Sequence, residues 1–282
     1  LSTKEFGTNL STYPLLQKLN YVVGKIKINS TDYYLDASIP FLPFGKLPLN
    51  CYNGHARVIS NDTTAVYFEP DLLKESKSTS VFIVNNNKNE VEGAYTKKLG
   101  FFESLNAKTS IAKSTLQSFE TNLKATYPEE MVLTNIKVDS FQIPEAAVTV
   151  KFDFKLPAFG DADIVYFNPF IGEALKKNPF YAAERIYPVE MPYTIDDLYI
   201  LNMEIPTGYK VDELPKAVRT LLNETEGSFE YLIQSDTNNI LIQCRLKLNK
   251  ATYYPEDYKT LRDFYASVVK KKAEQIVFKK IK

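Results

Sequence analysis

The chain has 282 residues, and its 34 basic and 34 acidic side chains give a formal net charge of zero at pH 7. This balance gives no electrostatic reason to expect nucleic acid or an anionic membrane surface as a partner. Hydrophobic residues make up 44% of the chain, enough for a buried core, and neither mark of disorder is present. No apolar run approaches the ~20 residues that span a bilayer, so no membrane span is expected.

The chain begins Leu-Ser-Thr-Lys-Glu-Phe-Gly, without an initiator methionine or a signal peptide. We therefore expect a fragment of a longer protein, whose targeting segment lies elsewhere.

The chain has only two cysteines, Cys51 and Cys244, and one histidine, His55. A single histidine excludes a His-based metal cluster, and without a Cys-x-x-Cys pair zinc bound by Cys and His is not expected. The two thiols lie far apart in sequence, so both are predicted to be unbonded and buried. A Cys51–His55 catalytic pair is disfavoured, because no family signature surrounds either residue.

No motif for a cofactor is present. The sequence has neither a GxxxxGK[ST] nor a GxGxxG phosphate loop, and no EF-hand pattern, so no cofactor or metal is expected. The acidic residues show no spacing that selects a glycosidase pair.

The first predicted element is a hairpin of residues 21–28 and 31–36, with Asn29-Ser30 as its two-residue loop. In this register Lys27 faces Asp32, and Tyr21 lies diagonal to Asp36 on the same face. A rival register, with Ser30-Thr31 as the loop, would place Lys25 opposite Asp36. Each register places a lysine opposite an aspartate, so the charge pairing does not choose between them and both registers remain possible.

Further elements follow along the chain. Period-2 alternation of apolar residues, as in Val148, Val150, Phe152, Phe154 and Leu156, is typical of strands with one buried face. A rise in polarity at residues 70–78 suggests a domain boundary. Strands are predicted at 80–87, 131–138, 147–156, 196–205, 228–235 and 239–248.

Helices are predicted at 110–126 and 255–272, with a short one at 171–176. Pro255 suits a first helical position. In the last long helix an apolar stripe should pack on a sheet: Tyr258, Leu261, Phe264, Tyr265, Val268 and Val269. The short helix lies between two Asn-Pro-Phe motifs, at 168–170 and 178–180. We interpret each motif as a turn with an aromatic anchor, in preference to a recognition loop.

Residues 18–48 read KLNYVVGKIKINSTDYYLDASIPFLPFGKLP. This segment resembles the end of a transglutaminase-like domain of the papain superfamily, as found in multi-domain bacterial envelope proteins. In that family an Asn-His opens one strand, and Leu-Asp-Ala-Thr ends the next. Here the second part stands as Leu35-Asp36-Ala37-Ser38. Later stretches resemble the family's C-terminal β domain: NPF, ERIYPVEMPY, IPTGYKVDELP, GSFEY and the final YKTLRDFYASVVKKKAEQIVFKK.

The resemblance implies a mainly β (α+β) chain. Residues 1–75 would be the C-terminal remnant of a transglutaminase-like core. Residues 76–282 would be an antiparallel β-sandwich-like domain with two or three packed helices. It also implies a location in the periplasm or cell envelope, with an envelope protein or a glycan as possible partner.

The chain departs from the family at its catalytic positions. Asn20-Tyr21 replaces the Asn-His, and a phenol with a pKa near 10 is a poor general base. Cys51 follows Asp36 and so stands in the wrong chain order for the nucleophile. Tyr21 and Asp36 are therefore predicted to be vestigial positions of an incomplete catalytic triad.

The chain is then a non-catalytic structural or partner-binding region of a transglutaminase-like envelope protein. Two alternatives stay open. One is the C-terminal portion of an active cysteine acyltransferase or protease whose nucleophile lies upstream. The other is a carbohydrate-binding module, suggested by the 19 tyrosines.

Overall fold

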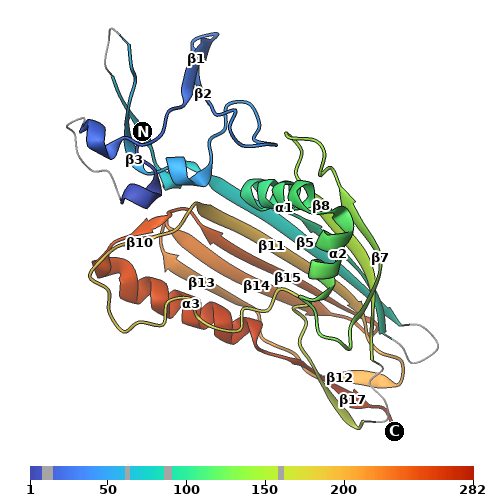
Figure 1. The fold of residues 1–282 in the computed structure, drawn as a ribbon. Helices are drawn as coiled ribbons and strands as arrows, with labels where there is room; N and C mark the ends of the chain where they lie inside the picture. The colour runs from blue at the N-terminus through green and yellow to red at the C-terminus, as the bar shows by residue number, and fades with distance from the viewer. Residues whose placement is uncertain (8–14, 61–63, 86–90, 158–161) are drawn as a thin grey trace.

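The computed structural model describes residues 1–7, 15–60, 64–85, 91–157 and 162–282. Its centre is one eight-stranded sheet with helices on one face (Figure 1). The described residues up to Leu72 lie at one end of this sheet (Figure 1). The predicted mainly β, α+β class is therefore confirmed. Across the sheet the strands follow in the order β13 (Val218–Asn223), β14 (Gly227–Ser235), β15 (Asn239–Leu248), β11 (Thr194–Glu204), β5 (Lys74–Asn85), β6 (Val91–Lys98), β8 (Thr149–Leu156) and β7 (Val132–Asp139).

The sheet is built from two halves of the chain. Residues 74–156 supply the four strands from β5 to β7, and residues 194–248 supply the four from β11 to β13. Neighbouring strands are antiparallel within each half, whereas β5 and β11, which join the halves, are parallel. The sheet is thus mixed. Helices, in place of a second large sheet, cover its inner face.

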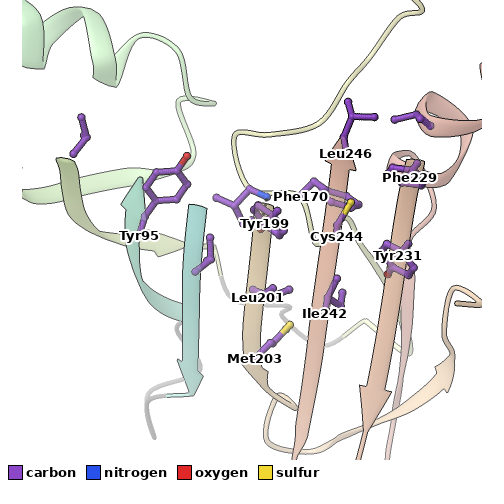
Figure 2. Close-up of a cluster of buried hydrophobic side chains, with 14 of the residues drawn as sticks. Tyr95, Phe170, Tyr199, Leu201, Met203, Phe229, Tyr231, Ile242, Cys244 and Leu246 are labelled. Carbon is purple, nitrogen blue, oxygen red and sulfur yellow. Dashed lines mark hydrogen bonds between the residues drawn. The ribbon is translucent and has the colours of Figure 1, made fainter. Parts of the chain in front are cut away.

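Alternation along each strand determines which side chains form the core. On β8 the predicted face is inward, with Val150, Phe152 and Phe154 buried. On β11 and β15 the buried side chains of Tyr199, Leu201 and Ile242 lie on the same side of the sheet (Figure 2). The outer face of the sheet exposes large apolar residues, among them Phe82, Val84, Leu232 and Leu241.

The helix predicted at 110–126 is wrong in its start and its continuity. The structure has α1 (Phe101–Lys113) and α2 (Leu116–Lys124). The first helix ends at Ser114, its C-cap residue. The Thr115 hydroxyl then caps the start of α2 by accepting a 3.0 Å hydrogen bond from the Ser118 N–H. The start of α1 is capped from a distant strand, because the Glu75 carboxylate accepts hydrogen bonds from the N–H groups of Phe102 and Glu103.

The C-terminal helix forms as predicted. A single 3₁₀ turn, η5 (Pro255–Asp257), leads into α3 (Tyr258–Lys272). The predicted stripe is inward, with Leu261, Phe264, Tyr265 and Val268 buried in the main core. These side chains fix α3 on the half of the sheet that β13, β14 and β15 form (Figure 1).

The helix predicted at 171–176 is wrong, because these residues form a turn and an irregular segment. The two Asn-Pro-Phe motifs explain the difference. The side chains of Asn168 and Asn178 accept hydrogen bonds from the N–H groups of Phe170 and Phe180, both at 2.9 Å. Their amide groups donate to backbone carbonyls of α3, those of Lys272 and Arg262. We call residues 168–187 the strap, since its two motifs hold it antiparallel to α3.

The aromatic residues of the motifs anchor the strap, as predicted. Phe170 is buried and packs on Tyr199, with ring centroids 5.1 Å apart. Phe180 packs edge-on against Tyr265 of α3 at 4.9 Å.

Smaller sheets complete the main body. A three-stranded sheet has the order β12 (Tyr209–Glu213), β17 (Ile276–Lys280) and β9 (Ile164–Phe167). A two-stranded pair joins β10 (Val189–Glu190) to β16 (Thr252–Tyr253). Among the described residues, no helix is long and apolar enough to cross a membrane.

The N-terminal unit, as we call the described residues up to Leu72, has a small core of its own. Its centre is formed by Leu1, Leu47, Cys51, Ala56 and Phe68, whereas the main core begins at Val81. The domain boundary near residue 75 stays a prediction. The elements of this unit are η1 (Lys4–Phe6), η2 (Leu16–Lys18), β1 (Gly24–Ile28), β2 (Thr31–Leu35), η3 (Leu49–Cys51), β3 (Gly54–Arg57), β4 (Ala65–Phe68) and η4 (Pro70–Leu72).

Two predicted strands differ clearly in where they begin. The strand predicted to begin at Tyr21 is regular only from Gly24. The one predicted at 80–87 begins earlier, at Lys74, because its polar residues alternate in phase with Val81 and Ile83. Residues 86 and 87 of that prediction lie outside the described residues. The strand β6 (Val91–Lys98) has no counterpart among the predicted strands.

Candidate functional site

The hairpin β1–β2 carries the predicted catalytic positions and has the predicted register. Asn29 and Ser30 both have positive φ, 47° and 67°, as a two-residue type I′ turn requires. Ile28 therefore pairs with Thr31, and the rival register is excluded. The charge pairing differs in one detail, because Asp32 bonds Lys25 diagonally at 2.8 Å and not Lys27 directly opposite.

Tyr21 and Asp36 meet at the open end of this hairpin. The Tyr21 hydroxyl donates a 2.6 Å hydrogen bond to Asp36 Oδ2 and lies 2.9 Å from Ser38 Oγ. The other carboxylate oxygen, Oδ1, accepts a 2.8 Å hydrogen bond from the Ser38 N–H. The predicted proximity of the two side chains is confirmed, and Ser38 joins them.

The electrostatics of this pair favour a phenol that keeps its proton. The hydrogen bond to Asp36 raises the pKa of Tyr21 above its ordinary value. Partial burial acts to raise the pKa of Asp36, but the hydrogen bonds from Tyr21 and Ser38 outweigh it and lower that pKa. Tyr21 is therefore a hydrogen-bond donor at neutral pH and does not act as a general base.

Cys51 and His55 are both buried in the core of the N-terminal unit. Burial, together with the charge of Asp36, raises the pKa of the Cys51 thiol to about 12. Burial also lowers the pKa of His55. Both groups are thus shifted towards their neutral forms, whereas a catalytic pair needs a readily formed thiolate beside a proton-accepting imidazole.

The second cysteine, Cys244, is buried on β15, and burial raises its pKa to about 11. Both cysteines are unbonded, as predicted. Within the described residues, no group of three or more His, Cys, Asp or Glu side chains could hold a metal ion.

A cavity of about 370 Å³ lies beside Tyr21. Apolar and aromatic side chains line it together with Lys25, Arg57 and Ser60; the former include Tyr21, Val23, Tyr34, Val66 and Phe68. The hairpin beside it exposes apolar side chains, with Val22 86% and Ile26 43% accessible. The region around Tyr21 and Asp36 therefore combines exposed apolar side chains with a cavity of mixed polar and apolar lining.

A second polar cluster, which the sequence analysis did not predict, lies under the strap on the inner face of the sheet. Glu173 accepts hydrogen bonds from the Tyr95 hydroxyl at 2.7 Å and from Lys97 Nζ at 2.8 Å. Lys77 lies between Asp197, at 3.2 Å, and Glu103, at 3.4 Å. These residues come from β5, β6, β11, α1 and the strap, so only the fold brings them together.

Pairing decides the charge state within this cluster. Burial acts to raise the pKa of Glu173, but Lys97 and Tyr95 outweigh it and lower that pKa. Burial acts to lower the pKa of Lys77, but Asp197 and Glu103 outweigh it and raise that pKa. Only about 20 Å³ of space adjoins the cluster, enough for a single water. We interpret the cluster as the polar attachment of the strap to the sheet and not as a substrate site.

Comparison with known proteins gives one partial family match. Residues 163–278, from β9 to β17, match a family described as "Domain of Unknown Function with solved-structure structure (DUF3858)". No curated protein matches the chain. Among solved structures, a crystal structure of a "putative protease" from Parabacteroides distasonis ATCC 8503 is 13% identical, with a TM-score of 0.43. The match covers 94% of this chain but 36% of that protein, so this chain spans about a third of its length.

Proposed function

We propose that this chain is a non-catalytic, structural or partner-binding region of a transglutaminase-like cell-envelope protein. The observation that carries the proposal is the Tyr21–Asp36 hydrogen bond. By the resemblance of residues 18–48, its two residues correspond to the His and Asp of the transglutaminase-like family, and here the bond joins a protonated phenol to a carboxylate. Such a pair stabilises the hairpin but has no means of activating a nucleophile.

The surroundings of the pair support a binding role for this end of the molecule. The hairpin projects from the body (Figure 1), and every residue of β1 is exposed. Its apolar side chains and the adjoining cavity offer a surface to another polypeptide segment. The transglutaminase-like ancestry and the envelope location rest on the resemblance of residues 18–48 and of the later motifs. The family match at 163–278 falls inside the proposed C-terminal domain.

An assay of the isolated chain tests the proposal. We expect no turnover of a chromogenic amide or of a glutamine-donor substrate, by the wild type or by Cys51→Ala. Turnover by the wild type that Cys51→Ala abolishes would overturn the proposal. It would instead show that Cys51 itself acts as a nucleophile, which differs both from the proposal and from the alternative of an enzyme whose nucleophile lies upstream.

A further inference from the structure

A second cavity, of about 320 Å³, lies where the N-terminal unit meets the β10–β16 pair. It shares no lining residue with the cavity beside Tyr21. Tyrosines and charged side chains from both sides of the junction line it: Tyr52, Tyr67, Tyr254, Lys4, Glu69 and Glu190. Junctions between structural units are frequent places for small-molecule sites. We call this cavity the tyrosine cleft.

The walls of the tyrosine cleft are held by hydrogen bonds on both sides. On the N-terminal side, the buried Asn53 amide donates to the carbonyls of Thr3, at 3.1 Å, and Gly7, at 2.8 Å. Across the junction, the Asp71 carboxylate accepts a hydrogen bond from the Ala251 N–H. The cleft is therefore formed before any ligand arrives, which reduces the ordering cost of binding.

The aromatic residues of the cleft keep much of their surface accessible. Tyr67, on β4, is 53% exposed and Tyr254, just after β16, is 52% exposed. Tyr52 is partly buried, and its ring contacts Phe68 edge-on at 6.1 Å. Exposed tyrosine rings with polar tips suit a ligand that is apolar on one face and polar at its edge.

The polar groups of the cleft include both donors and acceptors. The carboxylates of Glu69 and Glu190 can accept hydrogen bonds, whereas the Lys4 ammonium can only donate them. A sugar ring satisfies both kinds of group, because its hydroxyls donate and accept while its C–H face packs on an aromatic ring. We propose that the tyrosine cleft binds a neutral saccharide unit.

A cationic ligand is the main rival, because the acidic residues outnumber the single lysine. An ammonium or guanidinium group would interact well with tyrosine faces and carboxylates. Two of the three carboxylates already have partners, which reduces the attraction for a second cation: Glu190 interacts with the Lys4 ammonium, and Asp71 accepts a hydrogen bond from the Ala251 N–H. Glu69 and Glu190 thus serve as acceptors for hydroxyl groups. The inference is independent of the vestigial pair, so either proposal can fail without the other.

The test uses the whole chain and isothermal titration calorimetry. The probes are three neutral trisaccharides (cellotriose, maltotriose and N,N′,N″-triacetylchitotriose) and trilysine as the cationic probe. We expect at least one trisaccharide to bind with a Kd on the order of 1 mM or tighter, and trilysine not to bind. Tyr67→Ala and Tyr254→Ala should each weaken that binding by about tenfold or more, which corresponds to about 1.4 kcal/mol.

Tyr181→Ala is the matched control, because Tyr181 is 91% exposed and lies outside the cleft. It should leave binding unchanged, and thermal unfolding should show that all three variants fold. Three results would overturn the proposal: no binding of any trisaccharide at about 10 mM, binding of trilysine alone, or saccharide binding that survives both cleft substitutions.

Discussion

The hydroxyl of Tyr21 lies 2.6 Å from Oδ2 of Asp36 and closes the open end of the β1–β2 hairpin. Tyr21 lies three residues before Gly24 and Asp36 one residue after Leu35, the two residues of the last ladder pair. The contact joins the start of one strand to the end of the other. The phenol of Tyr21 lacks the acid–base properties of an imidazole, and this difference gives a direct chemical test of the coupling between positions 21 and 36.

Tyr21→His should place an imidazole beside the Asp36 carboxylate. Because a nearby negative charge favours the protonated form, we expect a pKa for this imidazole above the ordinary value of about 6.5. NMR titration can follow it apart from His55, whose pKa is lowered by burial. The added Asp36→Asn change should remove the increase. An imidazole that titrates normally in both variants would show that position 21 is not coupled to Asp36.

The local parts of this site were predictable from sequence, because hairpin register follows turn chemistry and strand alternation. Asn29-Ser30 supplies the positive φ values of a two-residue turn, and that turn fixes every later pair as far as Leu35. The α3 helix was predictable for a similar reason, since Pro255 and the apolar stripe are local signals.

Features that depend on distant residues were not predictable. The start of α1 is set by Glu75, a carboxylate on β5 that caps Phe102 and Glu103. The cluster around Glu173 needs the pairing of β5 with β6 and β11 before its members meet. One signal was present, because Glu75, Lys77 and Thr79 alternate in phase with buried Val81. Polar residues at inward positions of a strand indicate a buried polar cluster.

Removal of the Glu173 charge should destabilise the protein in a pH-dependent way. Glu173→Gln leaves Lys97 without its carboxylate, so we expect a loss of about 1–3 kcal/mol at pH 7. The pKa of Glu173 is lowered in the folded state. Its contribution is therefore present above the unfolded pKa of about 4.3 and is lost as the pH falls through the folded value.

Urea unfolding at pH 7 and pH 3 would measure this effect. The difference between the wild type and Glu173→Gln should shrink at the lower pH. Glu92→Gln is the matched control, because its pair with Lys155 is more exposed and should contribute about 0–1 kcal/mol. An equal difference at both pH values would contradict the assignment of an ionised, paired Glu173.

The strap should loosen when either of its asparagine anchors is removed. Asn168→Ala and Asn178→Ala each delete one turn bond and one bond to a carbonyl of α3, so we expect a loss of about 1–2 kcal/mol for each. Hydrogen exchange followed by mass spectrometry should show faster exchange in residues 168–187, with the β1–β2 hairpin unchanged. Asn202→Ala, at an exposed position of β11, is the control. Unchanged exchange in the strap would mean that the aromatic anchors alone hold it.

The packing of α3 on the sheet should account for a large part of the stability of the main body. Leu261 has no accessible surface and belongs to the main core, so Leu261→Ala removes buried contacts and leaves a cavity. We expect a loss of about 2–5 kcal/mol in the free energy of unfolding, measured by urea denaturation. Leu232→Ala is the matched control, because Leu232 is 48% exposed on the outer face, and its change should stay within about 0.5 kcal/mol. Equal effects of the two substitutions would show that the inward stripe of α3 does not hold the helix on the sheet.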